Sequence, residues 1–296
     1  MGRHNRRERW FDLGAAALQR VGATLPVNTY ACPQCLEPFD RSALSDGRLT
    51  VEDVPPVKVG GRPMVLTCQP CNNGAGSQLD ESAGEWHRMR GLLNQPGRAT
   101  PVQFAEGVNG ILSIADDQTV ILGVDPTRSH PGRYLTYIAE HEDRVKTSNL
   151  DPTAGLALFD FNVSFRVDKR RLRLSYLRAA YLAMFARWGY RLIISEVFEP
   201  VRRQLADPDA EIIRPIPVGL IDPLAAESSP KGYAGTLDGL GDTVVVIVNG
   251  LLCLLPGNRV DVTWWDRLAD LENPDLETFV GSEWAWPTEP EHRWDH

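Results

Sequence analysis

The stretch Leu49–Asn73 reads LTVEDVPPVKVGGRPMVLTCQPCNN, and its cysteines, Cys68 and Cys71, repeat the spacing of Cys32 and Cys35 upstream. A Cys-x-x-Cys motif places two thiolates on one tight turn, where both can reach a single ion. Two such motifs complete the four-thiolate tetrahedral site that is typical of structural zinc. We therefore predict that these four cysteines bind one Zn²⁺.

The residues around the two motifs predict two strands and a helix. Leu49–Val54 alternates in the manner of a strand and ends at Pro55-Pro56. Gly60-Gly61 then marks a turn, and Met64–Thr67 returns as a second strand. From Gln78 to Leu93 the apolar residues recur with helical spacing. Together these elements form a ββα unit held by zinc.

This order of parts resembles the zinc-containing HNH, or ββα-metal, endonucleases over about residues 28–93. In that family a CxxC precedes a strand with an acidic residue and a histidine, and a Gly-Gly loop, a second strand, CxxC-Asn and a helix follow. The resemblance implies that the zinc is structural and that a second ion, Mg²⁺ or Mn²⁺, performs the chemistry. Glu52 would be a carboxylate ligand of that catalytic ion and Asn72 its second ligand. The activity it implies is metal-dependent hydrolysis of phosphodiester bonds in DNA, by an HNH endonuclease.

The sequence departs from the family pattern where the general-base histidine should stand, because that residue is Asp53. The asparagine that orients the histidine is also not visible, since Pro63 and Met64 occupy its region. A carboxylate with a reference pKa near 3.9 is a weaker base than an imidazole near 6.5, and general-base catalysis contributes roughly 10²–10⁴-fold. Asp53 could instead be a further metal ligand beside Glu52, although neighbouring strand residues point to opposite faces unless a bulge intervenes.

Three interpretations of the module therefore stay open. It could be an active nuclease with an unusual base, or a degenerate one that binds nucleic acid or a protein partner without cutting. Position 53 could also carry an engineered inactivating change. The cheapest discriminator is whether the protein nicks DNA with Mg²⁺ or Mn²⁺.

The chain as a whole is predicted to be α+β, with a zinc-stabilised module and a second domain built on a mainly antiparallel sheet. Residues 169–190 are expected to form a helix with Asp168 as its N-cap, and Asn249-Gly250 marks a hairpin between two core strands. Further strands are expected at 110–115, 119–124, 158–167 and 211–220. The predicted divisions are a basic N-terminal arm or helix (1–27), the zinc module (28–98), the α+β domain (99–256) and an acidic, Trp-rich tail (257–296), with a linker at 93–101.

Charge is distributed unevenly along the 296 residues. The chain has 31 Lys and Arg against 39 Asp and Glu, a formal charge of −8, but residues 1–98 carry +2 and residues 257–296 carry −7. The net acidity therefore does not exclude a nucleic-acid partner, since phosphate binding depends on local charge.

Two segments outside the module are candidate interaction surfaces. Residues 169–191 contain seven cations and no acid, so Arg170, Arg171, Arg173 and Arg178 are candidate contacts to a phosphate backbone; the alternative is a polar helix face that neutralises nearby acids. The tail holds five of the eight tryptophans. It is expected to pack on its own domain, and the alternatives are docking of a protein partner or coverage of a basic groove.

The sequence contains no apolar run long enough for a signal peptide or a membrane span. A cytoplasmic protein without a membrane partner is therefore expected, and the excess of arginine over lysine, 27 to 4, indicates a bacterial source. The fifth cysteine, Cys253, lies in an apolar strand and is expected to be a buried small hydrophobic residue.

Overall fold

The chain folds into two units, as seen in a computed structural model that describes residues 3–293 except 23, 95–99, 115–119, 126, 141–156, 159–166, 221–229 and 272–274. Unit 1 combines residues 1–87 with residues 167–296, and unit 2 comprises residues 88–166. The second unit is thus inserted into the sequence of the first. These limits do not coincide with the predicted divisions at 98/99 and 256/257. The reason is that one hydrophobic core joins the cysteine motifs to the C-terminal half of the chain.

The first part of unit 1 surrounds the cysteine motifs. Its elements are α1 (Arg3–Arg20), β1 (Tyr30–Ala31), β2 (Pro38–Phe39), α2 (Ser42–Ser45), β3 (Leu49–Val54), the 3₁₀ helix η1 (Val57–Val59), β4 (Arg62–Cys68), α3 (Gln69–Gln78) and α4 (Asp80–Asn94), whose last turns fall in unit 2. The predicted strand at 49–54 is confirmed as β3, and the strand predicted at 64–67 lies within β4, its antiparallel partner. Helix α3 was not predicted, because glycines at 74 and 76 interrupt its sequence.

The second part of unit 1 is a helical layer and an antiparallel sheet. Its elements are α6 (Lys169–Trp188), α7 (Tyr190–Ile193), η4 (Glu196–Phe198), α8 (Glu199–Ala206), β9 (Val218–Leu220), β10 (Lys231–Leu237), β11 (Gly241–Val248), β12 (Leu251–Pro256), α9 (Trp264–Asp270), η5 (Leu276–Thr278) and β13 (Val280–Trp284). The strand order is β13-β10-β11-β12-β9, with antiparallel neighbours. The predicted hairpin between β11 and β12 is confirmed, and both of its turn residues, Asn249 and Gly250, have positive φ (49° and 72°).

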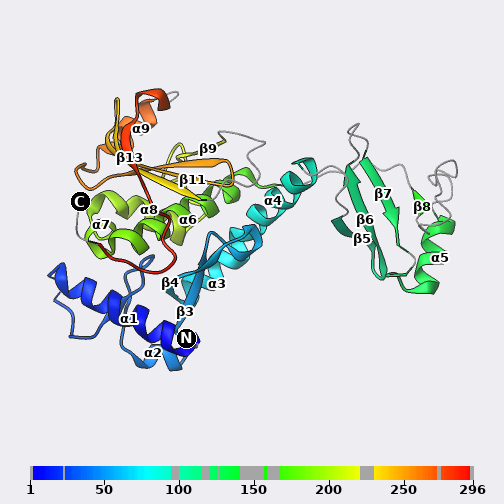
Figure 1. Ribbon diagram of the computed structural model, residues 1–296, viewed down its shortest axis with the longest axis horizontal. Helices are drawn as coiled ribbons and strands as arrows, with labels where there is room; N and C mark the ends of the chain where they lie inside the picture. The colour runs from blue at the N-terminus through cyan, green and yellow to red at the C-terminus, as the bar shows by residue number, and fades with distance from the viewer. Residues whose placement is uncertain are drawn as a thin grey trace. The chain divides into compact units, whose positions relative to one another are not determined.

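Helix α6 is the central element of unit 1. Its N-cap is Asp168, as predicted, and the carboxylate accepts hydrogen bonds from the backbone N–H groups of Arg170 and Arg171. The helix ends at Gly189, whose φ of 68° breaks the predicted continuation to residue 190. Side chains on α6 are buried almost all round, because it lies between the five-stranded sheet and the β3–β4 hairpin (Figure 1).

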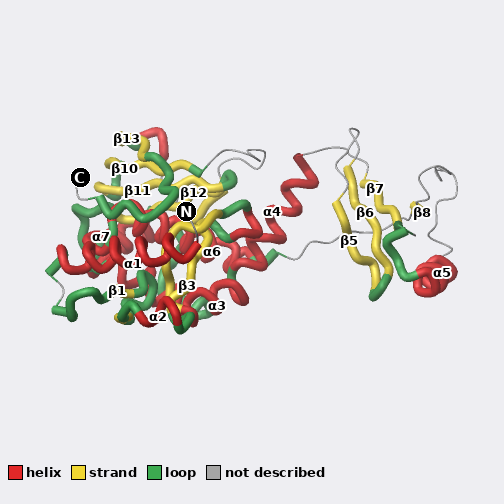
Figure 2. The backbone as a smooth tube through the Cα atoms, turned by 60° about the horizontal axis from the view of Figure 1, so that its bottom comes forward, coloured by secondary structure: helices red, strands yellow, loops and turns green. Residues whose placement is uncertain are grey.

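Both ends of the chain take part in the core of unit 1. The basic N-terminal segment forms α1, which contacts β1, β4 and α7 (Figure 2). This helix buries Trp10 and Phe11. Within the acidic tail, β13 pairs with β10, and Trp264 and Trp284 are buried. The tail thus packs on its own domain, as expected.

Unit 2 is a small antiparallel sheet with one helix. Its elements are β5 (Thr100–Ala105), β6 (Val108–Ile114), β7 (Val120–Val124), α5 (Pro131–Glu140) and β8 (Ala157–Leu158), and the strand order is β5-β6-β7-β8. Its core is small, with Val108 and Val124 packed against Phe104, Tyr134 and Tyr137. The strands predicted at 110–115 and 119–124 correspond to β6 and β7, whereas most of the one predicted at 158–167 lies outside the described residues.

The mixture of helices and antiparallel sheets agrees with the predicted α+β class. Among the residues that the structure describes, no helix combines the length and the apolar character needed to cross a bilayer.

Candidate metal centre and its buried ion pair

The four cysteines of the two CxxC motifs come together in one cluster. Cys32 and Cys35 lie on the turn of the β1–β2 hairpin, and Cys68 and Cys71 lie where β4 passes into α3. Their sulfur atoms all lie within 4.8 Å of one another. This is the only group of three or more metal-ligating side chains in the described part of the chain, and it confirms that the four residues predicted as ligands are neighbours in space.

The geometry of the cluster fits a tetrahedral zinc ion. A Zn–S bond of about 2.3 Å places the sulfurs of a tetrahedral site about 3.8 Å apart, and the Cys35 and Cys68 sulfurs are 3.7 Å apart. The N–H of Cys68 also donates to the sulfur of Cys32 at 3.4 Å, which stabilises a thiolate there. Cys71 lies in the first turn of α3, where the helix dipole favours negative charge. The four residues therefore suit Zn²⁺ as soft thiolate ligands.

The thiols also influence one another's ionisation. The hydrogen bond with Cys32 lowers the pKa of the Cys35 thiol and raises the pKa of the Cys71 thiol. Four thiols this close cannot all lose their protons without a cation between them, because the thiolates would repel one another. A bound divalent cation removes this conflict.

Side chains from α6 and α7 hold the first cysteine turn from the far half of the sequence. The Tyr181 hydroxyl donates to the carbonyl of Pro33, and the Tyr190 hydroxyl donates to the carbonyl of Ala31 and accepts from its N–H. Burial raises the pKa of both phenols, so they remain neutral donors at physiological pH. The first CxxC motif is thus fixed by contacts that cross more than 140 residues of sequence.

Arg178 of α6 makes the central polar contact of this region. Its two terminal nitrogens bind the two carboxylate oxygens of Glu52 at 2.9 and 2.6 Å. The second nitrogen also donates at 3.2 Å to the side chain of Gln34, which lies between the first two cysteines. Glu52 and Arg178 are only 4% and 2% exposed. The predicted carboxylate ligand of a catalytic ion is therefore engaged on both oxygens by a guanidinium.

Burial and neighbouring charges shift the pKa of both members of this pair. Burial raises the pKa of Glu52, and Arg178 only partly offsets this effect. Burial also lowers the pKa of Arg178, but the Glu52 charge and hydrogen bonds outweigh it, so the net shift is upward. A second acid, Asp80, is close enough to influence both groups and accepts a hydrogen bond from Ser175 at 3.0 Å. Two parallel contacts of this kind are typical of a carboxylate paired with a guanidinium.

Asp53 and Asn72, the other predicted catalytic residues, differ from Glu52 in burial and in their partners. A bulge lies between Glu52 and Asp53, and Asp53 is half-buried while Glu52 is fully buried. Partial burial raises the pKa of Asp53. The side-chain amide of Asn72 donates to the Thr50 hydroxyl at 2.9 Å and to the Val51 carbonyl at 3.1 Å, so it fastens α3 to β3.

The proposed phosphate-binding face of α6 is not a continuous surface. Arg178 is buried in its ion pair, which corrects its assignment as a phosphate contact. Arg170 donates to the carbonyls of Pro208 and Ala210, and Arg171 donates to the carbonyl of Gln78 and pairs with Asp168 and Asp209. Only Arg173 of the four is in the exposed class. Arg171 and Arg178 pair with acids, as the alternative expectation has it, whereas Arg170 binds backbone carbonyls.

Comparison with known proteins gave no match to a family model, a curated protein or a solved structure.

Proposed function

We propose that the chain is an HNH-like protein in which zinc stabilises the ββα unit and the catalytic metal site has been lost, so that the module binds DNA without cutting it. The observation that carries this proposal is the bidentate contact between Arg178 and Glu52. The guanidinium neutralises the carboxylate that the family pattern assigns to the catalytic ion. A divalent cation at Glu52 would have to displace a buried, positively charged neighbour.

DNA is the partner that the resemblance implies, and it is therefore the first to test. The order of β3, β4 and a following helix supports the resemblance, as does the cysteine cluster. A zinc-loaded protein should increase the fluorescence anisotropy of a labelled DNA duplex, and added salt should weaken the binding. Chelation of the zinc should abolish the binding. Loss of salt dependence, or equal binding after chelation, would contradict a role for the module.

A second candidate function is hydrolysis with Asp53 as the general base. The specific observation in its favour is the raised pKa of Asp53 beside the strand bulge, because a more basic carboxylate accepts a proton more readily. This candidate still requires a metal at Glu52, where Arg178 is bound.

A plasmid-nicking assay with Mg²⁺ or Mn²⁺ separates the two candidates. We expect no nicking by the unaltered protein and none by Asp53→His, because restoring the base does not free Glu52 from Arg178. Nicking by Asp53→His alone would show that the metal site is intact and only the base is missing. Nicking by the unaltered protein, abolished by Asp53→Asn, would establish hydrolysis.

A further inference from the structure

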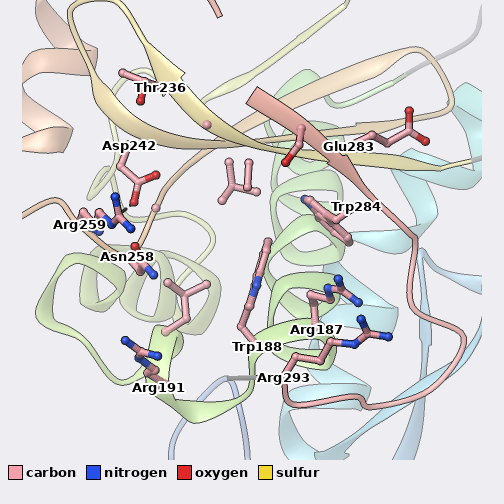
Figure 3. Close-up of a pocket in the computed structure, with 16 residues that line it drawn as sticks. Arg187, Trp188, Arg191, Thr236, Asp242, Asn258, Arg259, Glu283, Trp284 and Arg293 are labelled. Atoms are coloured by element: carbon pink, nitrogen blue, oxygen red, sulfur yellow. Dashed lines mark hydrogen bonds between the residues drawn. The ribbon is translucent and has the colours of Figure 1, made fainter. Parts of the chain in front are cut away.

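Two pockets of unit 1 differ in the chemistry of the side chains that line them. The larger, of about 530 Å³, lies between the five-stranded sheet and the end of α6, and in it Arg187 and Arg293 lie together (Figure 3) because both bind Glu291. The smaller, of about 320 Å³, lies beside the cysteine cluster and is lined by Cys35 and Cys71. The smaller pocket therefore gives a reagent access to nucleophilic side chains.

The four cysteines of the cluster are unequally accessible. Cys32 and Cys68 are buried, with 0% and 3% of their surface exposed. Cys71 is half-buried, and Cys35 is exposed. The cluster thus has a protected side, which belongs to the core of unit 1, and an open side, which faces the pocket. A reagent that enters from solvent meets Cys35 first.

Helices α3 and α8 bound the open side of the cluster. Helix α3 contributes Gly74 and Ala75 to the pocket, and α8 contributes Leu205 and Ala206. A Cβ added at Gly74 would meet no other atom within 4 Å, so there is open space beside the helix. The structure describes all of the lining residues, and none of them is acidic. A small oxidant, neutral or anionic, therefore meets no repelling carboxylate on its way to Cys35.

A second thiolate lies within reach of Cys35. The sulfurs of Cys35 and Cys68 are 3.7 Å apart, so an approach of roughly 2 Å would close a disulfide bond between them. Cys35 lies on the turn of the β1–β2 hairpin and Cys68 is the N-cap residue of α3, so neither is held inside a helix. An accessible thiolate beside a second, resolving cysteine is the arrangement found in cysteines that sense oxidants.

From this arrangement we propose that Cys35 is a site of oxidation by peroxide, and that the disulfide it then forms with Cys68 releases the zinc ion. The oxidation depends on the zinc site but not on DNA binding. It can therefore be tested without DNA, and it can fail or succeed independently of the function proposed for the module.

The two thiolates supply the two electrons that reduce one peroxide. The Cys35 thiolate attacks one oxygen of hydrogen peroxide, the O–O bond breaks, and the products are a sulfenic acid on Cys35 and a hydroxide ion. The Cys68 thiolate then attacks the Cys35 sulfur, the S–O bond breaks, and a second hydroxide ion leaves. Both hydroxide ions take protons from solvent, so one peroxide becomes two water molecules. Cys32 and Cys71 then remain as ligands, too few for the closed tetrahedral site that holds structural zinc.

Contacts from α6 and α7 keep the first cysteine turn in place when the metal leaves. The hydroxyls of Tyr181 and Tyr190 bind the carbonyls of Pro33 and Ala31, and Arg178 binds the side chain of Gln34. None of these contacts uses a cysteine side chain, so they persist after oxidation. We therefore expect that a thiol reductant and added Zn²⁺ restore the original state.

Titration of the full-length, zinc-loaded protein with hydrogen peroxide tests the proposal. A chromogenic chelator follows the released zinc, and a sample without peroxide corrects for zinc taken up by the chelator alone. Alkylation before and after reduction, read by mass spectrometry, identifies the oxidised cysteines. We expect one zinc ion released for each peroxide consumed, with Cys35 and Cys68 in the disulfide and Cys253, which is 2% exposed, still a thiol. Dithiothreitol with added Zn²⁺ should reverse the change.

A bulky residue at the mouth of the pocket tests the route of the oxidant. Ala206 is the exposed last residue of α8 and lines the pocket, so Ala206→Trp should slow the release of zinc several-fold. Ala16→Trp is the matched control, because it enlarges an exposed alanine of α1 outside the pocket, and it should leave the rate unchanged.

Retention of zinc in excess peroxide would overturn the proposal, as would release of zinc without a disulfide that contains Cys35. Pairing of Cys35 with Cys32 or Cys71 would overturn the assignment of Cys68 as its partner. Equal rates of zinc release in Ala206→Trp and Ala16→Trp would overturn the pocket as the route of the oxidant.

Discussion

Removal of the Arg178 guanidinium tests the ion pair on which the interpretation of the module depends. Arg178→Met keeps an unbranched side chain in α6 but leaves both oxygens of Glu52 without their partners at 2.9 and 2.6 Å. Thr67 remains as a donor to Glu52, at 3.3 Å. Because both members of the pair are buried, we expect a loss of about 3–5 kcal/mol in the free energy of unfolding.

The measurement is urea unfolding of the zinc-loaded protein followed by tryptophan fluorescence. All eight tryptophans lie within the residue ranges of unit 1, so the signal reports on that unit. Arg173→Ala is the control on the same helix, and its exposed side chain should change stability by no more than about 0.5 kcal/mol. Glu52→Leu should cost as much as Arg178→Met, whereas the double variant should cost less than either, because no uncompensated charge stays buried.

The pH dependence provides an independent check on Arg178→Met. Burial already raises the pKa of Glu52 in the native protein, and loss of the guanidinium removes the main influence that lowers it. Glu52 of the folded variant then binds its proton at a higher pH than the unfolded chain, in which the pKa of Glu is near 4.3. The stability deficit of Arg178→Met should therefore shrink as the pH falls from 7 toward 5. A loss below about 1 kcal/mol, or full additivity in the double variant, would refute the reasoning.

Three further predictions concern the metal, a buried histidine and the N-terminal helix. Elemental analysis of the unaltered protein should find one zinc ion per chain, which Cys35→Ser and Cys71→Ser should lose and Cys253→Ser should retain; a folded, metal-free protein would contradict the zinc assignment. Burial lowers the pKa of His292 to about 4. Between pH 6.5 and 4 the unfolded chain therefore binds a proton that the folded chain does not, and stability decreases by up to about 3 kcal/mol as the pH drops through that window. His292→Phe should flatten that part of the urea stability profile, and an unchanged slope would argue against a buried neutral imidazole. Trp10→Ala should destabilise unit 1 by about 3–5 kcal/mol in the same urea assay, because the side chain is 1% exposed, whereas a loose basic arm would show no effect.

Local patterns in the sequence were sufficient to predict the features whose causes are local. The spacing of the cysteines defines a cluster because each CxxC turn places its own two thiolates. The Asn249-Gly250 hairpin and the Asp168 cap depend on backbone conformations and hydrogen bonds within a few residues. Each of these was predicted correctly because its local conformation is set by residues close in sequence, although α6 and α7 also hold the first CxxC turn in place.

The division into units could not be read from the sequence for the opposite reason. Residues 93–101 have the composition of a linker and come after the cysteine motifs in sequence. The chain nevertheless returns to the first unit at residue 167. Helix α6 shows no narrow apolar stripe, since its leucines and alanines, together with Arg178 and Arg187, are buried against the N-terminal half of the unit. An insertion leaves no local signal, because the contacts that reunite the two halves join residues far apart in sequence.

The role of Arg178 illustrates how such a distant contact changes the meaning of a motif. As part of a run of seven cations it is indistinguishable from a phosphate-binding residue. Its partner lies 126 positions away on β3, at the residue that the family pattern assigns to a metal ion. A guanidinium supplies one positive charge and two fixed hydrogen bonds, but it cannot bind or activate water as a Lewis acid does. On the proposal that the catalytic metal site is lost, Arg178 takes the place of the cation at Glu52: it supplies the positive charge that the buried carboxylate needs and withholds the chemistry.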